Sequence, residues 1–167
     1  MVLVTVSDAS PATLLLEICR TRDLKLATVE SCTGGLLAGA LTGIAGASDV
    51  FDCGFITYSN EAKMELVGVP EDILKAHGAV SEAVARAMAE GLLTATSRAH
   101  LALAVTGIAG PSGGTAEKPV GLVHIAVTMR GGETLHRKLL LGDIGREAIR
   151  LRSVEEVLAL AQIAASG

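Results

Sequence analysis

Residues 26–41 have the sequence Leu-Ala-Thr-Val-Glu-Ser-Cys-Thr-Gly-Gly-Leu-Leu-Ala-Gly-Ala-Leu. The apolar and β-branched start of this segment predicts a buried strand, and its small apolar end predicts a closely packed helix. Ser31 lies on the glycine-rich turn between them. A hydroxyl on such a turn can stand clear of the backbone, and free amides at the helix start can receive a negative oxygen. The turn therefore predicts a nucleophile site, which still needs a base.

Strands and helices alternate on both sides of this turn. Apolar periodicity and capping residues predict helices over residues 11–22, 34–44, 61–67, 71–77, 82–93 and 146–163. Strands are predicted over residues 25–30, 50–58, 101–105, 119–129 and 134–141, with a hairpin at Gly131-Gly132. This order predicts an α/β fold: a mixed, mostly parallel sheet of about five strands with one antiparallel strand and helices on both faces.

Length and composition narrow the class of protein. At 167 residues, we expect a single domain over residues 1–167, with residues 1–9 as a flexible tail. Aromatic residues make up only 2% of the chain and hydrophobic residues 50%, so the core must be built mainly from aliphatic side chains. The net charge is −4 and no segment concentrates Lys and Arg, which argues against a nucleic-acid partner. No long apolar stretch or signal segment is present, so we expect a cytoplasmic protein without a membrane partner.

The cysteines and histidines follow no metal-binding pattern. Cys19, Cys32 and Cys53 are an odd number at spacings that match no zinc or disulfide framework, and buried thiols are the expected state. The four histidines form no His-Glu-x-x-His or Cys/His cluster. We therefore expect neither a metal nor a cofactor.

Lys63 is the candidate base for Ser31. If Asn60 caps the helix that follows the aromatic strand, Lys63 occupies its third position, where the positive end of the helix dipole disfavours a charged lysine. That field and partial burial would both lower its pKa, and a neutral lysine can deprotonate a serine. Tyr58, at the end of the strand, could relay a proton or align the pair. The alternative is that Tyr58 packs on the core and Lys63 is a solvated surface charge.

A second candidate site is the glycine-rich loop from Thr106 to Thr115, with Lys118 close behind. Its backbone amides could hold a phosphate. The spacing is neither that of a Walker A loop nor that of a Gly-x-Gly-x-x-Gly dinucleotide site. An ordinary glycine-rich connection is the alternative.

Four blocks of sequence occur together: Glu30-Ser-Cys-Thr-Gly-Gly35, Tyr58-Ser-Asn60 with Lys63, Thr106-Gly-Ile-Ala-Gly-Pro111 with Gly113-Gly114, and Lys118-Pro-Val-Gly121. Their order and spacing resemble the CinA C-terminal domain family over nearly the whole chain. The resemblance implies a three-layer α/β/α sandwich and a nicotinamide mononucleotide amidase, which forms nicotinate mononucleotide and ammonia in pyridine-nucleotide salvage. It also implies a competence- or damage-inducible context.

Transferred to this sequence, the resemblance makes Ser31 the nucleophile and Lys63 and Tyr58 its activating pair, with no metal. Its implied oxyanion and substrate contacts are Thr33, Gly34, Gly35, Asn60, Thr106, Gly107, Ala109, Gly110, Gly113, Gly114 and Lys118. One departure concerns an arginine expected soon after Gly142-Asp143, because Ile144 and Gly145 intervene before Arg146. The resemblance therefore assigns no role to Arg146.

Two other functions stay open on the sequence. One is a non-catalytic, nucleotide-binding regulatory module of the same fold, and the other is an amidase that acts on a related pyridine amide. In each case the partner is a small molecule. The alanine-rich helical surface also favours pairing with another copy, so we expect a homo-oligomer.

Overall fold

The computed structural model of the chain describes residues 9–167. Its strands are β1 (Leu26–Glu30), β2 (Phe51–Ile56), β3 (Leu101–Gly107), β4 (Leu122–Met129) and β5 (Thr134–Leu140). Its α-helices are α1 (Pro11–Thr21), α2 (Leu36–Thr42), α3 (Asn60–Val67), α4 (Glu71–His77), α5 (Glu82–Ala95) and α6 (Arg146–Ser166). The expected tail, residues 1–9, lies outside the described residues except for its last position.

The strands form one mixed sheet in the order β2-β1-β3-β4-β5. β1 pairs in parallel with β2 and with β3, whereas β4 is antiparallel to both β3 and β5. The predicted sheet, with its single antiparallel strand, is therefore confirmed. The short link between β4 and β5, residues 130–133 with Gly131-Gly132 at its centre, forms the expected hairpin, in which Gly131 has a φ of 77°.

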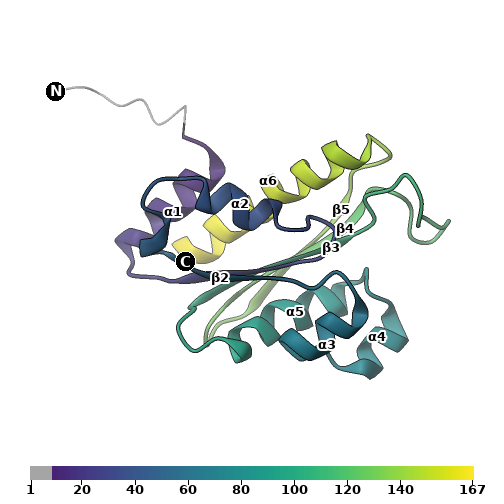
Figure 1. Ribbon diagram of the computed structural model, residues 1–167, viewed down its shortest axis with the longest axis horizontal. Coiled ribbons are helices and arrows are strands. Elements are labelled where there is room, and N and C mark those ends of the chain that lie inside the picture. Colours follow the sequence, from purple (N-terminus) through teal and green to yellow (C-terminus); the bar gives the residue numbers. More distant parts are fainter. Residues whose placement is uncertain (1–8) are drawn as a thin grey trace.

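Helices cover both faces of the sheet, as Figure 1 shows, with α1, α2 and α6 on one side and α3, α4 and α5 on the other. Each side has its own aliphatic core. The α1, α2 and α6 side buries Leu26, Leu103 and Ile125, and the α5 side buries Val29, Ala104 and Ala126. This alternation along each strand follows from the two-residue period of a β-strand, and it gives the three layers that the resemblance implies.

The boundaries differ from the prediction at the helix that carries Lys63. Ser59, not Asn60, is the N-cap of α3, because Ser59 has an extended backbone and its hydroxyl accepts a hydrogen bond from the amide of Ala62. Asn60 is therefore the first residue of the helix, and Lys63 is the fourth rather than the third. Within residues 9–167 no helix is long and apolar enough to cross a membrane.

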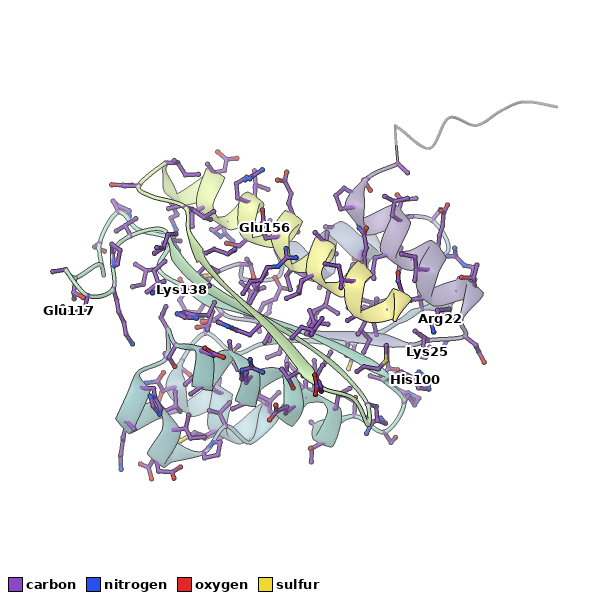
Figure 2. All side chains as sticks on the ribbon, turned by 180° about the vertical axis from the view of Figure 1, so that it is seen from behind. Arg22, Lys25, His100, Glu117, Lys138 and Glu156 are labelled. Atoms are coloured by element: carbon purple, nitrogen blue, oxygen red, sulfur yellow. The ribbon has the colours of Figure 1, made fainter. Side chains whose placement is uncertain are left out.

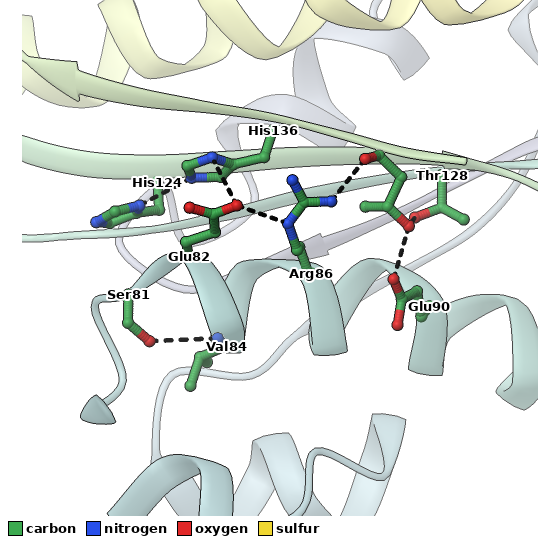
Figure 3. A network of polar contacts seen from close by, with 9 residues as sticks. Ser81, Glu82, Val84, Arg86, Glu90, His124, Thr128 and His136 are labelled. Carbon is green, nitrogen blue, oxygen red and sulfur yellow. Dashed lines mark hydrogen bonds and ion pairs between the residues drawn. The ribbon is translucent and has the colours of Figure 1, made fainter. Parts of the chain in front are cut away.

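A polar network joins α5 to the β4–β5 hairpin (Figure 3). His124 on β4 and His136 on β5 share a hydrogen bond of 2.9 Å, and His136 lies 3.6 Å from the carboxylate of Glu82. Arg86, one turn further along α5, bonds the same carboxylate and the carbonyl of Thr134. Burial and the nearby His136 lower the pKa of His124 to about 4. Both imidazoles are thus held neutral between α5 and the sheet near pH 7.

Candidate active site

A cavity of about 280 Å³ opens where the parallel strands end. β1 runs into Ser31, β2 leads to Tyr58, and β3 runs into the glycine-rich loop, so parallel pairing brings all three segments to one edge of the sheet. In Figure 2 this is the end opposite Arg22, Lys25 and His100, and Glu117 lies at the tip of the loop that projects from it. The cavity is lined by Ser31, Cys32, Tyr58, Lys63, residues 79–80, residues 106–110, Ser112, Gly113 and Arg146.

Ser31 is fixed by the end of the sheet. Its amide donates to the carbonyl of Val105 on β3 at 3.0 Å, and its carbonyl accepts from the amide of Gly34 at the same distance. The residue is 9% exposed, so its hydroxyl is largely shielded from water. Gly34 has a φ of 56° and Gly35 one of 106°, conformations that a residue with a Cβ rarely adopts. The glycines therefore make the tight turn that follows the hydroxyl.

Lys63 places an amine, the candidate base, beside the nucleophile turn. Its Nζ lies 3.2 Å from Oγ of Ser31 and donates to the carbonyl of Thr57 at 2.7 Å. Lys63 is 1% exposed, and none of the ion pairs found within residues 9–167 includes it. Burial lowers its pKa, and the nearby Cys32 opposes this effect only partly. The lowered pKa, which was expected from the helix field and partial burial together, is due mainly to burial, which favours the neutral amine.

Cys32 does not compete with Ser31 as an anionic nucleophile. Its thiol is 6% exposed, and burial raises its pKa to about 11. A thiol needs to ionise before it attacks, so at neutral pH this side chain is an uncharged part of the cavity wall. The expected buried state is also found for Cys19, which is fully buried, but not for Cys53, which is only partly buried at the edge strand β2.

Glu30 occupies the start of α2. Its buried carboxylate accepts hydrogen bonds from the amides of Gly35, Leu37 and Ala38, at 2.9 to 3.2 Å. These are the free amides that the sequence offered for an oxyanion, and the amide of Gly34 is already donated to Ser31. Of the amides from Thr33 to Gly35, only that of Thr33 donates no hydrogen bond within residues 9–167. The expected oxyanion site is thereby narrowed to Thr33.

Tyr58 lies on the cavity but is not placed between Ser31 and Lys63. Its side chain is 61% exposed, and its hydroxyl accepts a hydrogen bond from Nη2 of Arg146 at 3.1 Å. Nη1 of the same arginine donates to the carbonyl of Gly110 at 2.8 Å. Arg146, to which the sequence assigned no role, therefore joins the tyrosine to the glycine-rich loop. The expected alignment of Ser31 and Lys63 by the phenol is absent from the described hydrogen bonds.

The glycine-rich loop presents its backbone to the cavity. At its base the amide of Ile108 donates to the carbonyl of Leu122 at 2.9 Å, and its carbonyl accepts from the amide of Gly121 at 2.8 Å. The hydroxyl of Thr106 donates to the carbonyl of Ala79 at 2.9 Å. Gly110 has a φ of 75°, and a Cβ there would lie 2.6 Å from Val120. Among the described contacts, the amides of Ala109, Ser112 and Gly113 donate no hydrogen bond. This loop is consequently rigid at its base and has amides to offer an anion.

Several predicted contact residues lie outside the cavity lining. Asn60 instead borders a groove between α3 and α4. Lys118 donates its Nζ to the carbonyl of His77 at 2.6 Å, where it caps the end of α4 rather than facing the cavity. Thr33, Gly34, Gly35 and Gly114 also lie outside the lining, whereas Thr106, Gly107, Ala109, Gly110 and Gly113 are part of it. The direct contacts expected of Asn60 and Lys118 are not supported by this geometry.

Sequence reasoning missed Arg150. Its Nε donates to the carbonyl of Cys32 at 3.0 Å and its Nη2 to that of Thr33 at 3.1 Å. The available signal was spacing, since Arg146 and Arg150 are four residues apart and therefore share one face of a helix. Nothing local, however, indicated that this face meets a turn more than a hundred residues earlier in the chain.

Together these groups form a buried serine and amine pair at the edge of a cavity whose other side offers backbone amides and a guanidinium. Such a pair can perform nucleophilic acyl transfer without a metal ligand, and the cationic side can hold an anionic group of the same substrate. Within residues 9–167 no group of three or more His, Cys, Asp or Glu side chains is arranged to hold a metal ion.

Comparisons with known proteins agree with this fold. Residues 8–164 match the model of the CinA C-terminal domain. The chain is 53% identical over 138 residues to a CinA-like protein of Akkermansia muciniphila, which covers 83% of this chain and 33% of that protein. A CinA-like protein of Anaeromyxobacter sp. is 52% identical over 143 residues, which covers 86% of this chain and 34% of the relative. The chain thus spans about a third of the length of the curated relatives it matches.

Solved structures give the same result. The competence/damage inducible protein CihA from Agrobacterium tumefaciens superposes with a TM-score of 0.90 at 47% identity, covering 98% of this chain and 100% of that one. A CinA superfamily protein from Klebsiella pneumoniae superposes with a TM-score of 0.87 at 34% identity, covering 93% and 96%. The protein is therefore a member of the CinA C-terminal domain family.

Proposed function

We propose that this chain is an amidohydrolase that converts nicotinamide mononucleotide into nicotinate mononucleotide and ammonia. The observation that carries the proposal is the 3.2 Å approach of Lys63 Nζ to Ser31 Oγ in a cavity that also contains Arg146. An amide substrate with a distant phosphate suits this arrangement, because the two ends of the cavity offer different chemistry. Pyridine-nucleotide salvage is the corresponding metabolic role.

The chemistry begins with Lys63 as a neutral base. Lys63 accepts the proton of Ser31 as Oγ attacks the amide carbon, and the carbonyl oxygen becomes an oxyanion. Collapse of this intermediate breaks the carbon–nitrogen bond, and the lysine ammonium returns the proton to the leaving ammonia. Water then attacks the ester on Ser31 with the same base, which releases the carboxylate product and restores the hydroxyl.

The phosphate end of the substrate is assigned to the glycine-rich loop and Arg146. The unengaged amides of Ala109, Ser112 and Gly113 supply hydrogen-bond donors, and the guanidinium supplies a charge. Arg146 already bonds the carbonyl of Gly110, so its position is fixed before a ligand arrives. Free nicotinamide lacks both the ribose and the phosphate, and it should therefore be a poor substrate.

The test is release of ammonia from nicotinamide mononucleotide by the purified chain, with nicotinate mononucleotide identified by mass. Ser31→Ala should reduce turnover by at least about 10³-fold while the protein stays folded. Binding of the nucleotide without turnover by the unmodified chain would instead favour a regulatory module. Turnover of other pyridine amides at equal rates would indicate a broader amidase.

A further inference from the structure

Arg150 contacts the nucleophile turn from outside the cavity. Its guanidinium spans two successive peptide units, with Nε on the carbonyl of Cys32 and Nη2 on that of Thr33. An ideal Cβ on Gly34 would lie 3.3 Å from Nη2, so the turn and the guanidinium are closely packed. The fork of Arg150 thus holds the backbone directly after Ser31 against α6.

This contact fixes the direction of the peptide amides. The peptide bond between Cys32 and Thr33 is trans, because the only cis bond in residues 9–167 joins Gly110 to Pro111. In a trans peptide the N–H points away from its own carbonyl oxygen. With the carbonyl of Cys32 held on α6, the Thr33 amide is turned away from that helix, and, like the amide of the cavity-lining Cys32, it donates no hydrogen bond among the described contacts.

We infer that Arg150 is a positioning residue that orients the Thr33 amide to receive the oxyanion formed at Ser31. This inference rests on the proposed acyl transfer, and Arg150 itself touches no substrate. A hydrogen bond from a cation to the carbonyl also polarises the same peptide unit, which makes its N–H a stronger donor. The positive charge lies near enough to lower the pKa of the adjacent Cys32 thiol against the larger effect of burial.

Substitution of Arg150 should slow chemistry more than binding. Arg150→Met keeps the aliphatic stem but loses both hydrogen bonds, and we expect kcat to fall about 10- to 100-fold with little change in KM, as for loss of part of an oxyanion site. Arg150→Lys should remain impaired, because an ammonium cannot form the same fork. Arg152→Met is the matched control, since Arg152 lies two residues further on and forms ion pairs with Glu155 and Glu156 on its own helix.

Covalent labelling of Ser31 tests this inference without depending on which substrate the enzyme uses. An alkyl fluorophosphonate forms a phosphorus–oxygen bond with Oγ of Ser31 and releases fluoride, and its phosphoryl oxygen takes the oxyanion position. Labelling, followed by intact mass, should slow about 10-fold or more in Arg150→Met and not in Arg152→Met. In Arg150→Ala, guanidinium ion at concentrations well below those that unfold the chain should restore labelling. A purely structural role would give no such rescue.

The outcomes are distinct. Labelling of Arg150→Met at the wild-type rate overturns the inference, and so does a wild-type chain whose Ser31 is never labelled. Equal unfolding midpoints in urea for Arg150→Lys and the unmodified chain establish that a slower rate is not loss of fold. If Ser31 is labelled in an Arg150-dependent manner but nicotinamide mononucleotide is not hydrolysed, the substrate assignment fails and the positioning role stands.

Discussion

The hydroxyl of Tyr58 accepts a hydrogen bond from Arg146 at 3.1 Å, and both side chains line the cavity that contains Ser31. This bond joins the end of β2 to the start of α6. It places the chain's only tyrosine beside the guanidinium proposed to bind the substrate phosphate, and leaves Lys63 as the candidate base within reach of Ser31. From this contact we expect the two residues to serve substrate binding more than proton transfer.

Tyr58→Phe tests that division of roles. The change removes only the hydroxyl that accepts from Arg146, so we expect KM for nicotinamide mononucleotide to rise while kcat stays within about tenfold of the unmodified chain. Steady-state kinetics with the nucleotide measure both constants. A loss of kcat as large as that of Lys63→Met would instead place the phenol in proton transfer.

Arg146→Met should weaken recognition of the phosphate. A guanidinium paired with a phosphate contributes a strong, charge-assisted bond, so KM for the nucleotide should rise about 10- to 100-fold. Nicotinamide riboside, which has the same amide and no phosphate, serves as the comparison substrate. The ratio of kcat/KM for nucleotide over riboside should fall in the variant; an unchanged ratio would place the phosphate elsewhere.

Lys63→Met should abolish turnover and change how stability depends on pH. Burial lowers the pKa of Lys63 from its ordinary 10.5, so the unfolded chain binds a proton at this site that the folded chain releases. The lysine therefore disfavours folding increasingly as pH falls from 10.5 to the folded-state pKa. The free energy of unfolding of Lys63→Met minus that of the unmodified chain should therefore increase as pH falls from 10 to 7, as measured by urea unfolding.

The exposed Lys75 provides the control for this comparison, because its side chain is 72% exposed on α4. Lys75→Met should show no such pH-dependent gap. If the stability gap of Lys63→Met were the same at both pH values, the amine would be charged in the folded protein, and its role as a base would be contradicted.

Glu30→Gln should destabilise the fold. The carboxylate accepts three hydrogen bonds at the start of α2, and an amide of the same size presents one nitrogen to those donors. We expect a loss of about 2 kcal/mol in the free energy of unfolding. Glu117→Gln, at the tip of the projecting loop in Figure 2, should leave the urea midpoint unchanged. Equal midpoints for both variants would show that the three bonds add no net stability.

His124 should account for part of the loss of stability at acid pH. Its folded pKa of about 4 lies below the ordinary 6.5, so its contribution is complete above pH 6.5 and is lost as pH falls towards 4. Glu82 opposes this shift, whereas His136, Lys138 and Lys118 add to it. His124→Asn should flatten the decline of unfolding free energy between pH 6.5 and 4. An unchanged slope would mean that His124 is protonated in the folded chain.

The sequence predicted the fold well because the relevant signals are local. Apolar periodicity and capping residues located the helices and strands, and the glycine pair at Gly131-Gly132 located the hairpin. Lys63 was also found locally, as a residue in the first turns of a helix where a cation is unfavourable, and the structure brings it within hydrogen-bond distance of Ser31. Its catalytic role stays a prediction.

The missed parts depend on contacts between distant segments. Arg150 meets the nucleophile turn across 118 and 117 residues, and Arg146 meets Tyr58 across 88. Periodicity shows which face of α6 is apolar but not which turn that helix crosses. Glu30 was missed for another reason: a carboxylate at the end of a strand is expected to face solvent, and only the tight turn at Gly34-Gly35 brings the helix amides back over it.

The carboxylate of Glu30 also affects how charge is distributed around the cavity. The start of α2 already has its counterion, supplied by the chain itself, so its amides are not available to a phosphate, and under the proposed function that phosphate is directed to Arg146 instead. We therefore expect a substrate with an anion at one end and a neutral amide at the other to bind in one orientation, with its amide end towards Ser31.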